Sequence, residues 1–204
     1  SDLKKRIIEI EEFASDVSHE LKNPLAGLKS SNELLEAKKL NEKNKDLLIK
    51  NMGLDIHRMN ILISDISNYS LTQVEISEES FEEVDIIDLL KKFKNSLSKS
   101  NYLLNIKYKE KKIYLKINKD KFLQVMHNLL DNALTFIPVN SNILIYIKKN
   151  NLDCIIHFAD QGCGISLDYK YKIFQRFYTD RNIDRNSHSG LGLSISKKII
   201  ESFD

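Results

Sequence analysis

His19 is the residue whose type and neighbours best fit covalent chemistry, because a carboxylate, Glu20, follows it directly. An imidazole is largely neutral at pH 7 and can act as a nucleophile, while a carboxylate can hold its other ring nitrogen. The surrounding stretch reads FASDVSHELKNPL and includes Asn23 and Pro24. A lone exposed histidine on a helix is more often only a solvated residue. A chemical role for His19 therefore needs support from other parts of the chain.

The pattern around His19 predicts a long helix over residues 3–37 with a heptad seam. The a positions are Ile7, Ala14, Leu21, Leu28 and Leu35, and the d positions are Ile10, Val17, Pro24 and Ser31. His19 then falls at position f, farthest from the seam, and is expected to point into water. Pro24 lies inside the pattern and is expected to bend the helix about one turn after His19.

A second helix is expected over residues 46–69, after a polar turn over residues 38–44. Its apolar residues repeat the same steps of four and three, and Asp55 is the one polar interruption. Two amphipathic helices joined by a short turn form a hairpin, which cannot bury both seams by itself. We therefore expect residues 1–71 to form a homodimeric four-helix bundle.

Glycine pairs mark two loops in the second half of the chain. Asp160, Gly162 and Gly164 follow a predicted strand, and Gly190 and Gly192 open a predicted helix. Glycines in such places let backbone amides approach an anion, and the helix N-terminus favours negative charge. Neither pair has Rossmann or P-loop spacing, and each alone is as easily an ordinary turn. The order of the two pairs, with an aspartate at the end of a strand before the first pair, indicates a nucleotide-binding site more specifically than either pair alone.

Asn128 and Asn132 lie four residues apart in a helix predicted over residues 120–136, so they share one face. Amide oxygens are hard ligands of the kind that Mg²⁺ accepts beside phosphates. Seen alone, the pair is more often two solvated or capping amides.

The elements expected around these loops interleave helices and strands. Asp85 is predicted to cap a helix that ends near Leu97, and a further short helix is expected over residues 168–177. Strands are predicted over residues 102–109, 112–118, 142–149 and 152–159, with a tight turn at Asn150 and Asn151. Antiparallel hairpins among them predict an α+β sandwich rather than a doubly wound sheet.

Composition excludes several classes of function. Lys and Arg number 31 against 29 for Asp and Glu, a net charge of +2, so there is no electrostatic case for nucleic acid or an acidic membrane. No apolar run approaches the length of about 18 residues that a transmembrane helix needs. Cys154 and Cys163 form no metal-binding pattern and are expected to be reduced thiols.

These motifs together resemble the core of a sensor histidine kinase. The stretch around His19 is similar to the family's H-box, residues 128–133 to its N-box, and residues 160–165 and 190–192 to its two glycine boxes. Residues 174–177, FQRF, resemble the F-box between them. The order and spacing match over essentially the whole chain, and the stretches FASDVSHELKNPL, RFYTDR and SGLGLSIS are similar to the ChvG/BvrS type of alphaproteobacteria.

The resemblance implies a role for each matching position. His19 is the phospho-acceptor, Glu20 its base, and Asn23 positions a water for phosphatase action on a response regulator. Asn132 ligates Mg²⁺ and Asn128 supports the phosphates of ATP. Asp160 accepts a hydrogen bond from the adenine amine. Gly162, Gly164, Gly190 and Gly192 shape the adenine pocket and its lid, and Arg176 reaches the phosphates. Thr135 and Phe136 stand where many members have a lysine and an aromatic residue, which removes one phosphate contact.

The same resemblance implies three regions and a location. Residues 1–71 form the dimerisation and phosphotransfer hairpin, 72–84 a linker, and 85–204 a Bergerat-type ATP-binding sandwich that lacks its last strands. The chain is then the cytoplasmic portion of an inner-membrane sensor, whose partners are a second copy and the receiver domain of a response regulator. Two alternatives stay open: a non-catalytic dimeric signalling scaffold, and another ATPase of the same fold. Retention of His19, Asn132 and Asp160 argues against the first, and the H-box against the second.

Overall fold

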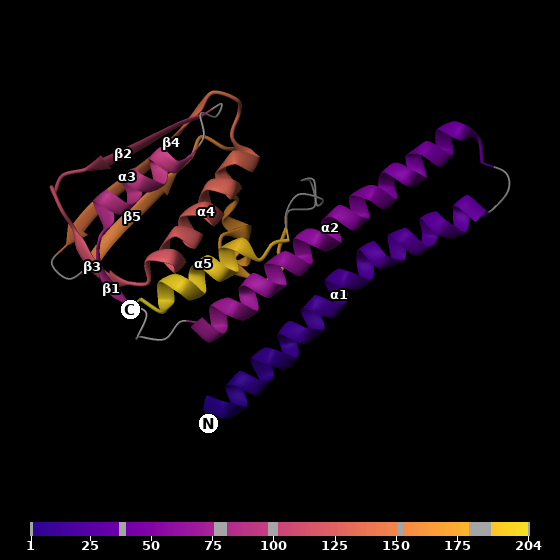
Figure 1. Cartoon of the computed structure of the whole chain (residues 1–204), viewed down its shortest axis with the longest axis horizontal. Coiled ribbons are helices and arrows are strands. Elements are labelled where there is room, and N and C mark those ends of the chain that lie inside the picture. The colour runs from indigo at the N-terminus through magenta and orange to yellow at the C-terminus, as the bar shows by residue number, and fades with distance from the viewer. Residues whose placement is uncertain are drawn as a thin grey trace. The chain divides into compact units, whose positions relative to one another are not determined.

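The computed structural model describes residues 2–36, 40–75, 81–97, 102–150, 153–179 and 189–203. They form two compact units (Figure 1). The first contains Ser1–Leu71 and Lys172–Ser194, and the second contains Thr72–Tyr171 and Ile195–Asp204. A segment far along the sequence thus belongs with the N-terminal helices. In the described part of the chain, no helix is both long enough and apolar enough to cross a membrane.

Two long helices, α1 (Asp2–Glu36) and α2 (Glu42–Glu75), form the predicted hairpin. The second helix begins inside the predicted turn because the Asn41 side chain accepts a hydrogen bond from the backbone N–H of Asn44 at 2.9 Å. It also continues past the predicted end at Tyr69. The last residue of the first predicted helix, 37, and residues 38–39 of the predicted turn lie outside the described residues.

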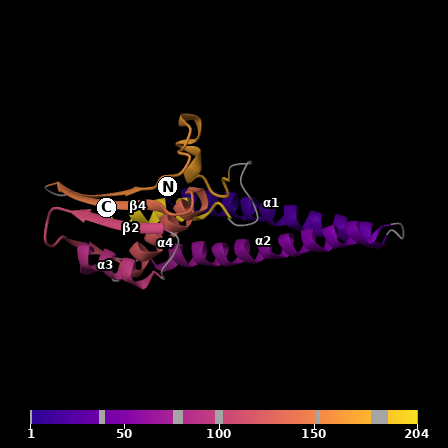
Figure 2. The ribbon, with the colours of Figure 1, turned by 90° about the horizontal axis from the view of Figure 1, so that it is seen from above.

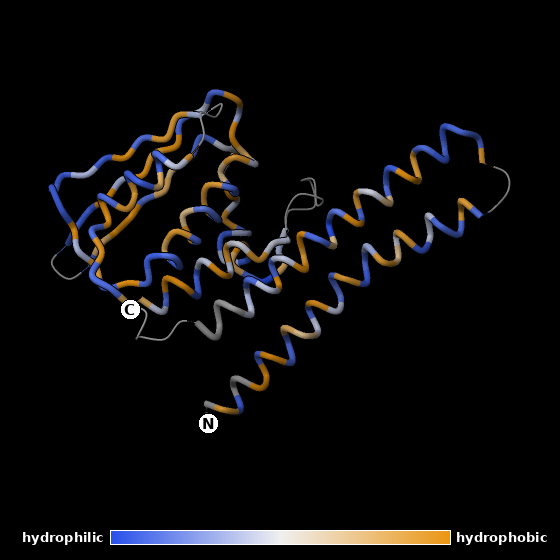
Figure 3. Tube along the Cα trace, in the orientation of Figure 1, coloured by the Kyte–Doolittle hydropathy of each residue, from blue (hydrophilic) through white to orange (hydrophobic). Residues whose placement is uncertain are grey.

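The seam between α1 and α2 follows the predicted heptads over most of its length. Pro24 and Ser31 of α1 are buried, as are Leu62 and Tyr69 of α2. The N-terminal seam positions Ile7 and Ile10 are exposed. Apolar and polar residues alternate along both helices (Figure 3). The hairpin alone therefore covers only part of its apolar surface.

Pro24 lies inside α1 and does not end it, since the helix continues to Glu36. A proline in a helix interior removes one backbone hydrogen bond, which leaves a carbonyl one turn earlier, near Glu20, without its usual donor. The backbone around His19 is therefore held by fewer hydrogen bonds than the rest of α1.

The second unit contains two small sheets. Strands β1 (Glu82–Asp85) and β3 (Tyr114–Ile117) pair antiparallel. The larger sheet has the order β2-β4-β5, formed by β2 (Tyr102–Tyr108), β4 (Ser141–Asn150) and β5 (Asp153–Ala159). The predicted hairpin of β4 and β5 is confirmed, although Asn151 of its expected turn lies outside the described residues. Strand β2 lies parallel to β4, because a helical crossover separates the two strands in sequence.

Three helices accompany the sheets: α3 (Ile86–Ser96), α4 (Lys119–Phe136) and α5 (Gly192–Glu201). The predicted cap of α3 is confirmed, because the Asp85 side chain accepts from the backbone N–H of Ile87 at 3.1 Å. Figure 2 shows α3 and α4 on one face of the sheet that contains β2 and β4.

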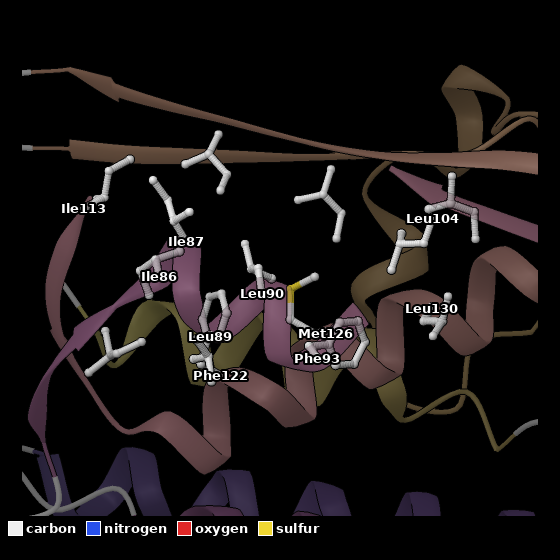
Figure 4. Packing of buried hydrophobic residues seen from close by; sticks show 14 of the residues in the cluster. Ile86, Ile87, Leu89, Leu90, Phe93, Leu104, Ile113, Phe122, Met126 and Leu130 are labelled. Carbon is white, nitrogen blue, oxygen red and sulfur yellow. The ribbon is translucent and has the colours of Figure 1, made fainter. Parts of the chain in front are cut away.

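The core of the second unit lies between that face and the two helices (Figure 4). Every second residue of β4 is buried there, namely Ile143, Ile145 and Ile147. The helices contribute residues three or four apart, including Ile86, Leu89, Leu90 and Phe93 of α3 and Phe122, Met126, Leu130 and Ala133 of α4. The predicted helix–sheet sandwich is confirmed, and its core fixes the end of α4.

The prediction of a helix over residues 168–177 is wrong. Two single 3₁₀ turns, Leu167–Tyr169 and Lys172–Phe174, stand in its place. Leu167 and Tyr171 are more than four-fifths exposed. Short helices depend on packing an apolar face, and this segment has none that is buried.

Candidate active site

His19 lies on the outside of α1 with its side chain exposed, as its f position predicts. Among the described residues, the structure gives the imidazole no hydrogen-bond partner. The neighbouring Ser18 hydroxyl donates to the carbonyl of Ala14 at 2.8 Å and is thereby held against the helix. The Ser18 hydroxyl is therefore engaged by the helix backbone, whereas the His19 ring is accessible to solvent.

Glu20 forms an ion pair with a residue of the other helix, and within the described residues no hydrogen bond joins its carboxylate to the His19 ring. Arg58 of α2 donates from a terminal guanidinium nitrogen to Glu20 Oε2 at 2.9 Å. The two side chains are only 17% and 25% exposed, for Arg58 and Glu20 respectively. Sequence reasoning missed Arg58, although a charged residue beside the apolar seam of α2 could have marked it.

Asn23 is exposed on α1, one helical turn after His19. The next residue, Pro24, is buried in the seam. The burial of Pro24 fixes the side of the helix that faces α2. His19 and Asn23 consequently share the solvent-facing side, and a reactant at His19 has access to the Asn23 amide.

Asn128 and Asn132 are both half-buried on α4. The Asn128 amide donates to the Ser196 hydroxyl of α5 at 3.2 Å. This bond joins the helix of the N-box to the helix that follows the second glycine pair. The Thr135 hydroxyl donates a hydrogen bond to the backbone carbonyl of Asp131, one turn earlier, at 2.9 Å. This hydroxyl is therefore bonded within its own helix.

Asp160 shapes the loop that follows β5. Its Oδ1 accepts a hydrogen bond from the backbone N–H of Gly162 at 2.7 Å. A Cβ on Gly162 would lie 3.1 Å from Phe136 Cβ at the end of α4, so only glycine fits there without displacement. Gly164 has a φ of 77°, which favours glycine. The Asp160 loop is therefore built against the helix that carries Asn128 and Asn132.

Arg176 is occupied by α1 rather than free for a phosphate. Its guanidinium lies 3.4 Å from a Glu12 carboxylate oxygen and 3.6 Å from one of Asp16, and it donates to the Glu9 carbonyl at 3.4 Å. It also lies over the Phe13 ring, 5.8 Å from its centroid. These partners are more than 150 residues away in sequence, and no local pattern indicated them.

The second glycine pair packs against the F-box backbone. Gly190 has a φ of 77°, and a Cβ there would lie 2.6 Å from the carbonyl carbon of Phe177. The Phe177 ring in turn stacks on Phe13 of α1, with centroids 6.4 Å apart. Ser189 donates to a carboxylate oxygen of Asp65 in α2. Gly192 then opens α5.

The predicted site residues thus fall into two groups. The second unit holds Asn128, Asn132, Asp160, Gly162 and Gly164, whereas the first holds His19, Glu20, Asn23, Arg176, Gly190 and Gly192. Within the described ranges, no three His, Cys, Asp or Glu side chains cluster in a way that could hold a metal ion.

Two protein-family models match the chain. The His Kinase A (phospho-acceptor) domain matches residues 9–73, which contain His19. The family described as histidine kinase-, DNA gyrase B- and HSP90-like ATPase matches residues 117–204, which contain both asparagines of α4 and both glycine pairs.

Curated relatives include two proteins named sensor protein ChvG. The protein from Rhizobium meliloti is 35% identical over 98% of this chain, and that from Agrobacterium fabrum is 36% identical over 98%. The match covers 37% and 35% of those two proteins, so the chain spans about a third of their length.

Solved structures with the same fold include histidine kinase ThkA in complex with the response regulator protein TrrA. That structure covers 97% of this chain at 23% identity with a TM-score of 0.61, and 56% of the ThkA chain is matched. Full-length ShkA in complex with AMPPNP covers 94% of this chain at 21% identity with a TM-score of 0.59, and 41% of it is matched. The phospho-acceptor match and the ATPase match follow each other along one chain, and the chain thus holds the two core domains of a sensor histidine kinase, similar to those of the ChvG proteins.

Proposed function

We propose that this chain uses ATP to phosphorylate His19 and then passes the phosphoryl group to an aspartate of a response-regulator receiver domain. The observation that carries the proposal is the exposed His19 on α1, inside a phospho-acceptor domain that shares its chain with a histidine-kinase-like ATPase domain. The ThkA structure contains a response regulator, which supports this class of partner.

His19 and Glu20 divide the chemical step between them. One ring nitrogen attacks the γ-phosphorus, and the carboxylate takes the proton from the other nitrogen. Asn23, on the same solvent-facing side of α1, is proposed to orient a water when the partner is dephosphorylated. Phosphoryl transfer depends mainly on positioning and charge stabilisation, which the bound nucleotide and its surroundings supply.

ATP is proposed to bind along α4 and the Asp160 loop. Asp160 Oδ1 is held by the Gly162 amide, which leaves Oδ2 as an acceptor for the adenine amine. Asn128 is fixed by Ser196 and borders the phosphates. Gly164 and Gly190, both with a φ of 77°, give the two loops their turns, and Gly192 begins α5. Arg176 can reach a phosphate only if it gives up its contacts with Glu12 and Asp16.

Mg²⁺ fits this arrangement as part of a nucleotide complex. The half-buried Asn132 offers one amide oxygen, and Mg²⁺ keeps several waters and takes its remaining ligands from phosphates. When bound, the ion would neutralise phosphate charge. Asn132 would hold it, and its neighbour Asn128 would orient the phosphates.

The regions proposed are a phosphotransfer hairpin over residues 1–71, a linker over 72–84 and an ATP-binding domain over 85–204. The continuation of α2 to Glu75 places the start of this linker within a helix. The location of the chain, in the cytoplasmic portion of an inner-membrane sensor, is likewise a proposal that rests on the family resemblance.

A second copy of the chain is the proposed cover for the exposed side of the hairpin. Ile49, Ile56 and Ile63 lie seven residues apart on α2 and are all about half exposed. On α1, Leu25 and Leu34 are exposed to a similar degree. A heptad stripe of this kind is typical of a four-helix bundle made from two hairpins.

Ile56→Asp is expected to convert the dimer to a monomer without unfolding the hairpin. Ile56 is 51% exposed in the single chain, so the new charge meets water there, whereas in the bundle it would be buried without a partner. Sedimentation at micromolar concentration measures the change. His57→Asp places a carboxylate at an exposed position about 100° around α2 from Ile56 and serves as the control. A wild-type chain that sediments as a monomer would contradict the proposal.

The two cysteines provide a test of nucleotide binding within one molecule. Burial raises the pKa of the Cys154 thiol, so less of it is thiolate at a given pH. Cys163 is exposed between Gly162 and Gly164. At pH 7.5 iodoacetamide is expected to modify Cys163 first, and Cys154 only as the pH rises.

MgATP is then expected to slow the modification of Cys163 several-fold and leave that of Cys154 unchanged. Mass spectrometry of the two peptides measures both rates in one sample. MgGTP, which lacks the adenine amine, is the control and should protect less. Equal rates with and without MgATP would argue against a nucleotide at this loop.

The test of the proposed function itself is the detection of phosphohistidine after incubation with MgATP. A signalling scaffold would acquire no label, and an ATPase of the same fold would release phosphate without labelling the protein. Acid-labile label on the protein distinguishes the kinase from both.

A further inference from the structure

Arg58 and Glu20 form a shielded ion pair that links the two helices of the hairpin. The guanidinium donates to Glu20 Oε2 at 2.9 Å, and both side chains are largely removed from water. Charge-assisted hydrogen bonds of this kind are stronger than neutral ones, and partial burial protects them from screening by salt. The pair therefore determines where the Glu20 carboxylate rests.

That resting place is away from His19. Adjacent residues on a helix point in directions about 100° apart and do not face each other. His19 is exposed, whereas the Glu20 side chain is drawn toward α2 by Arg58. In the described residues there is no hydrogen bond between the Glu20 carboxylate and the His19 ring. The base and the nucleophile of the proposed reaction are thus separated by an alternative partner.

Arg58 is not fully satisfied by this arrangement. Its Nε is buried and has no hydrogen-bond partner in the described part of the chain. A guanidinium carries five N–H donors, and a buried donor without an acceptor is unfavourable. The ion pair consequently lacks part of the stabilisation that a fully paired arginine would provide, which makes an exchange of partners by Glu20 easier.

We propose that Arg58 is a positioning residue that restrains Glu20, so that phosphorylation of His19 requires the carboxylate to move from Arg58 to the imidazole. The inference rests on the proposed kinase function. In the step it governs, one ring nitrogen of His19 forms the N–P bond while the P–O bond to ADP breaks and its electron pair leaves with ADP. The proton on the other ring nitrogen passes to Glu20 only when Arg58 has released it.

Arg58→Gln tests the restraint, because it removes the positive charge and the terminal guanidinium nitrogen that binds Glu20. With saturating MgATP, the initial rate of His19 labelling is expected to rise about threefold or more. The KM for ATP should stay unchanged, because Arg58 belongs to the helical hairpin. Arg58→Lys retains a charge and should fall between the wild type and Arg58→Gln. Lys50→Gln removes a charge from an exposed position of α2 and is the matched control.

The role of Glu20 is isolated by a double variant. Glu20→Gln alone is expected to slow labelling, and adding Arg58→Gln to it should give no further change, since no carboxylate remains to be released. Circular dichroism checks that each variant is helical. Arg58→Met, an apolar replacement, provides a second variant if Arg58→Gln does not fold.

Four results would overturn the proposal. Slower labelling in Arg58→Gln that Arg58→Lys restores would mean that Arg58 assists Glu20 instead of restraining it. An equal acceleration with Glu20→Gln present would mean that the effect does not pass through the carboxylate. An unchanged rate in a labelled, folded Arg58→Gln protein refutes the restraint alone, whereas a wild-type chain without label refutes the kinase proposal and this inference together.

Discussion

Replacing His19 by glutamine is expected to abolish labelling of the protein from γ-³²P-ATP. His19 is exposed on α1, and the hydroxyl of its neighbour Ser18 is bonded to the Ala14 carbonyl. Loss of a nucleophile or of a general base lowers reaction rates strongly. We therefore expect no detectable rate of labelling in His19→Gln. The measurement is the label retained on the protein after gel electrophoresis.

The chemical stability of the label identifies the residue class. A phosphoramidate breaks in acid and survives alkali, whereas phosphoserine behaves in the opposite way. The experiment uses the 204-residue chain and its His19→Gln variant. Lys22→Gln alters an exposed residue one turn from His19 and should keep the label. Label that resists acid, or persists in His19→Gln, would show that the nucleophile is another residue.

Asp160→Asn is expected to weaken ATP binding by roughly 10- to 100-fold, or about 1–3 kcal/mol for a lost hydrogen bond that leaves mismatched groups. The Gly162 amide donates to Asp160 Oδ1 at 2.7 Å, and this bond would orient an asparagine oxygen toward Gly162. The asparagine NH₂ group would then face the adenine amine, so that two donors meet where a donor and an acceptor met before. Titration calorimetry with MgATP measures the loss.

Inosine triphosphate makes this test specific to the adenine amine, which it lacks. The wild type should bind it more weakly than ATP, and Asp160→Asn should reduce or remove that difference. Asp168→Asn removes a charge from an exposed residue of the nearby 3₁₀ turn and should leave affinity unchanged. If Asp160→Asn lowers the affinity for both nucleotides equally, the carboxylate supports the loop and does not read the base.

Features that depend on neighbouring residues were predictable from the sequence. The heptad register placed His19 on the exposed side of α1, and Asp85 was correctly expected to cap α3. Apolar residues that repeat every 3.6 residues predicted the helices of the second unit, and those that repeat every two residues predicted its strands. Side chains return to the same face of a helix or strand at those intervals. The fold class and the family resemblance rest on this local information.

The pairing of residues far apart in sequence was decided only by the tertiary structure. Glu20 binds Arg58 across the hairpin, and Arg176 binds Glu12 and Asp16 on α1, although the sequence assigned Glu20 to His19 and Arg176 to phosphate. A charged side chain has several possible partners, and its choice depends on which elements pack beside it and how much water they exclude. The sequence specifies the donors and acceptors, but distance and burial select among them.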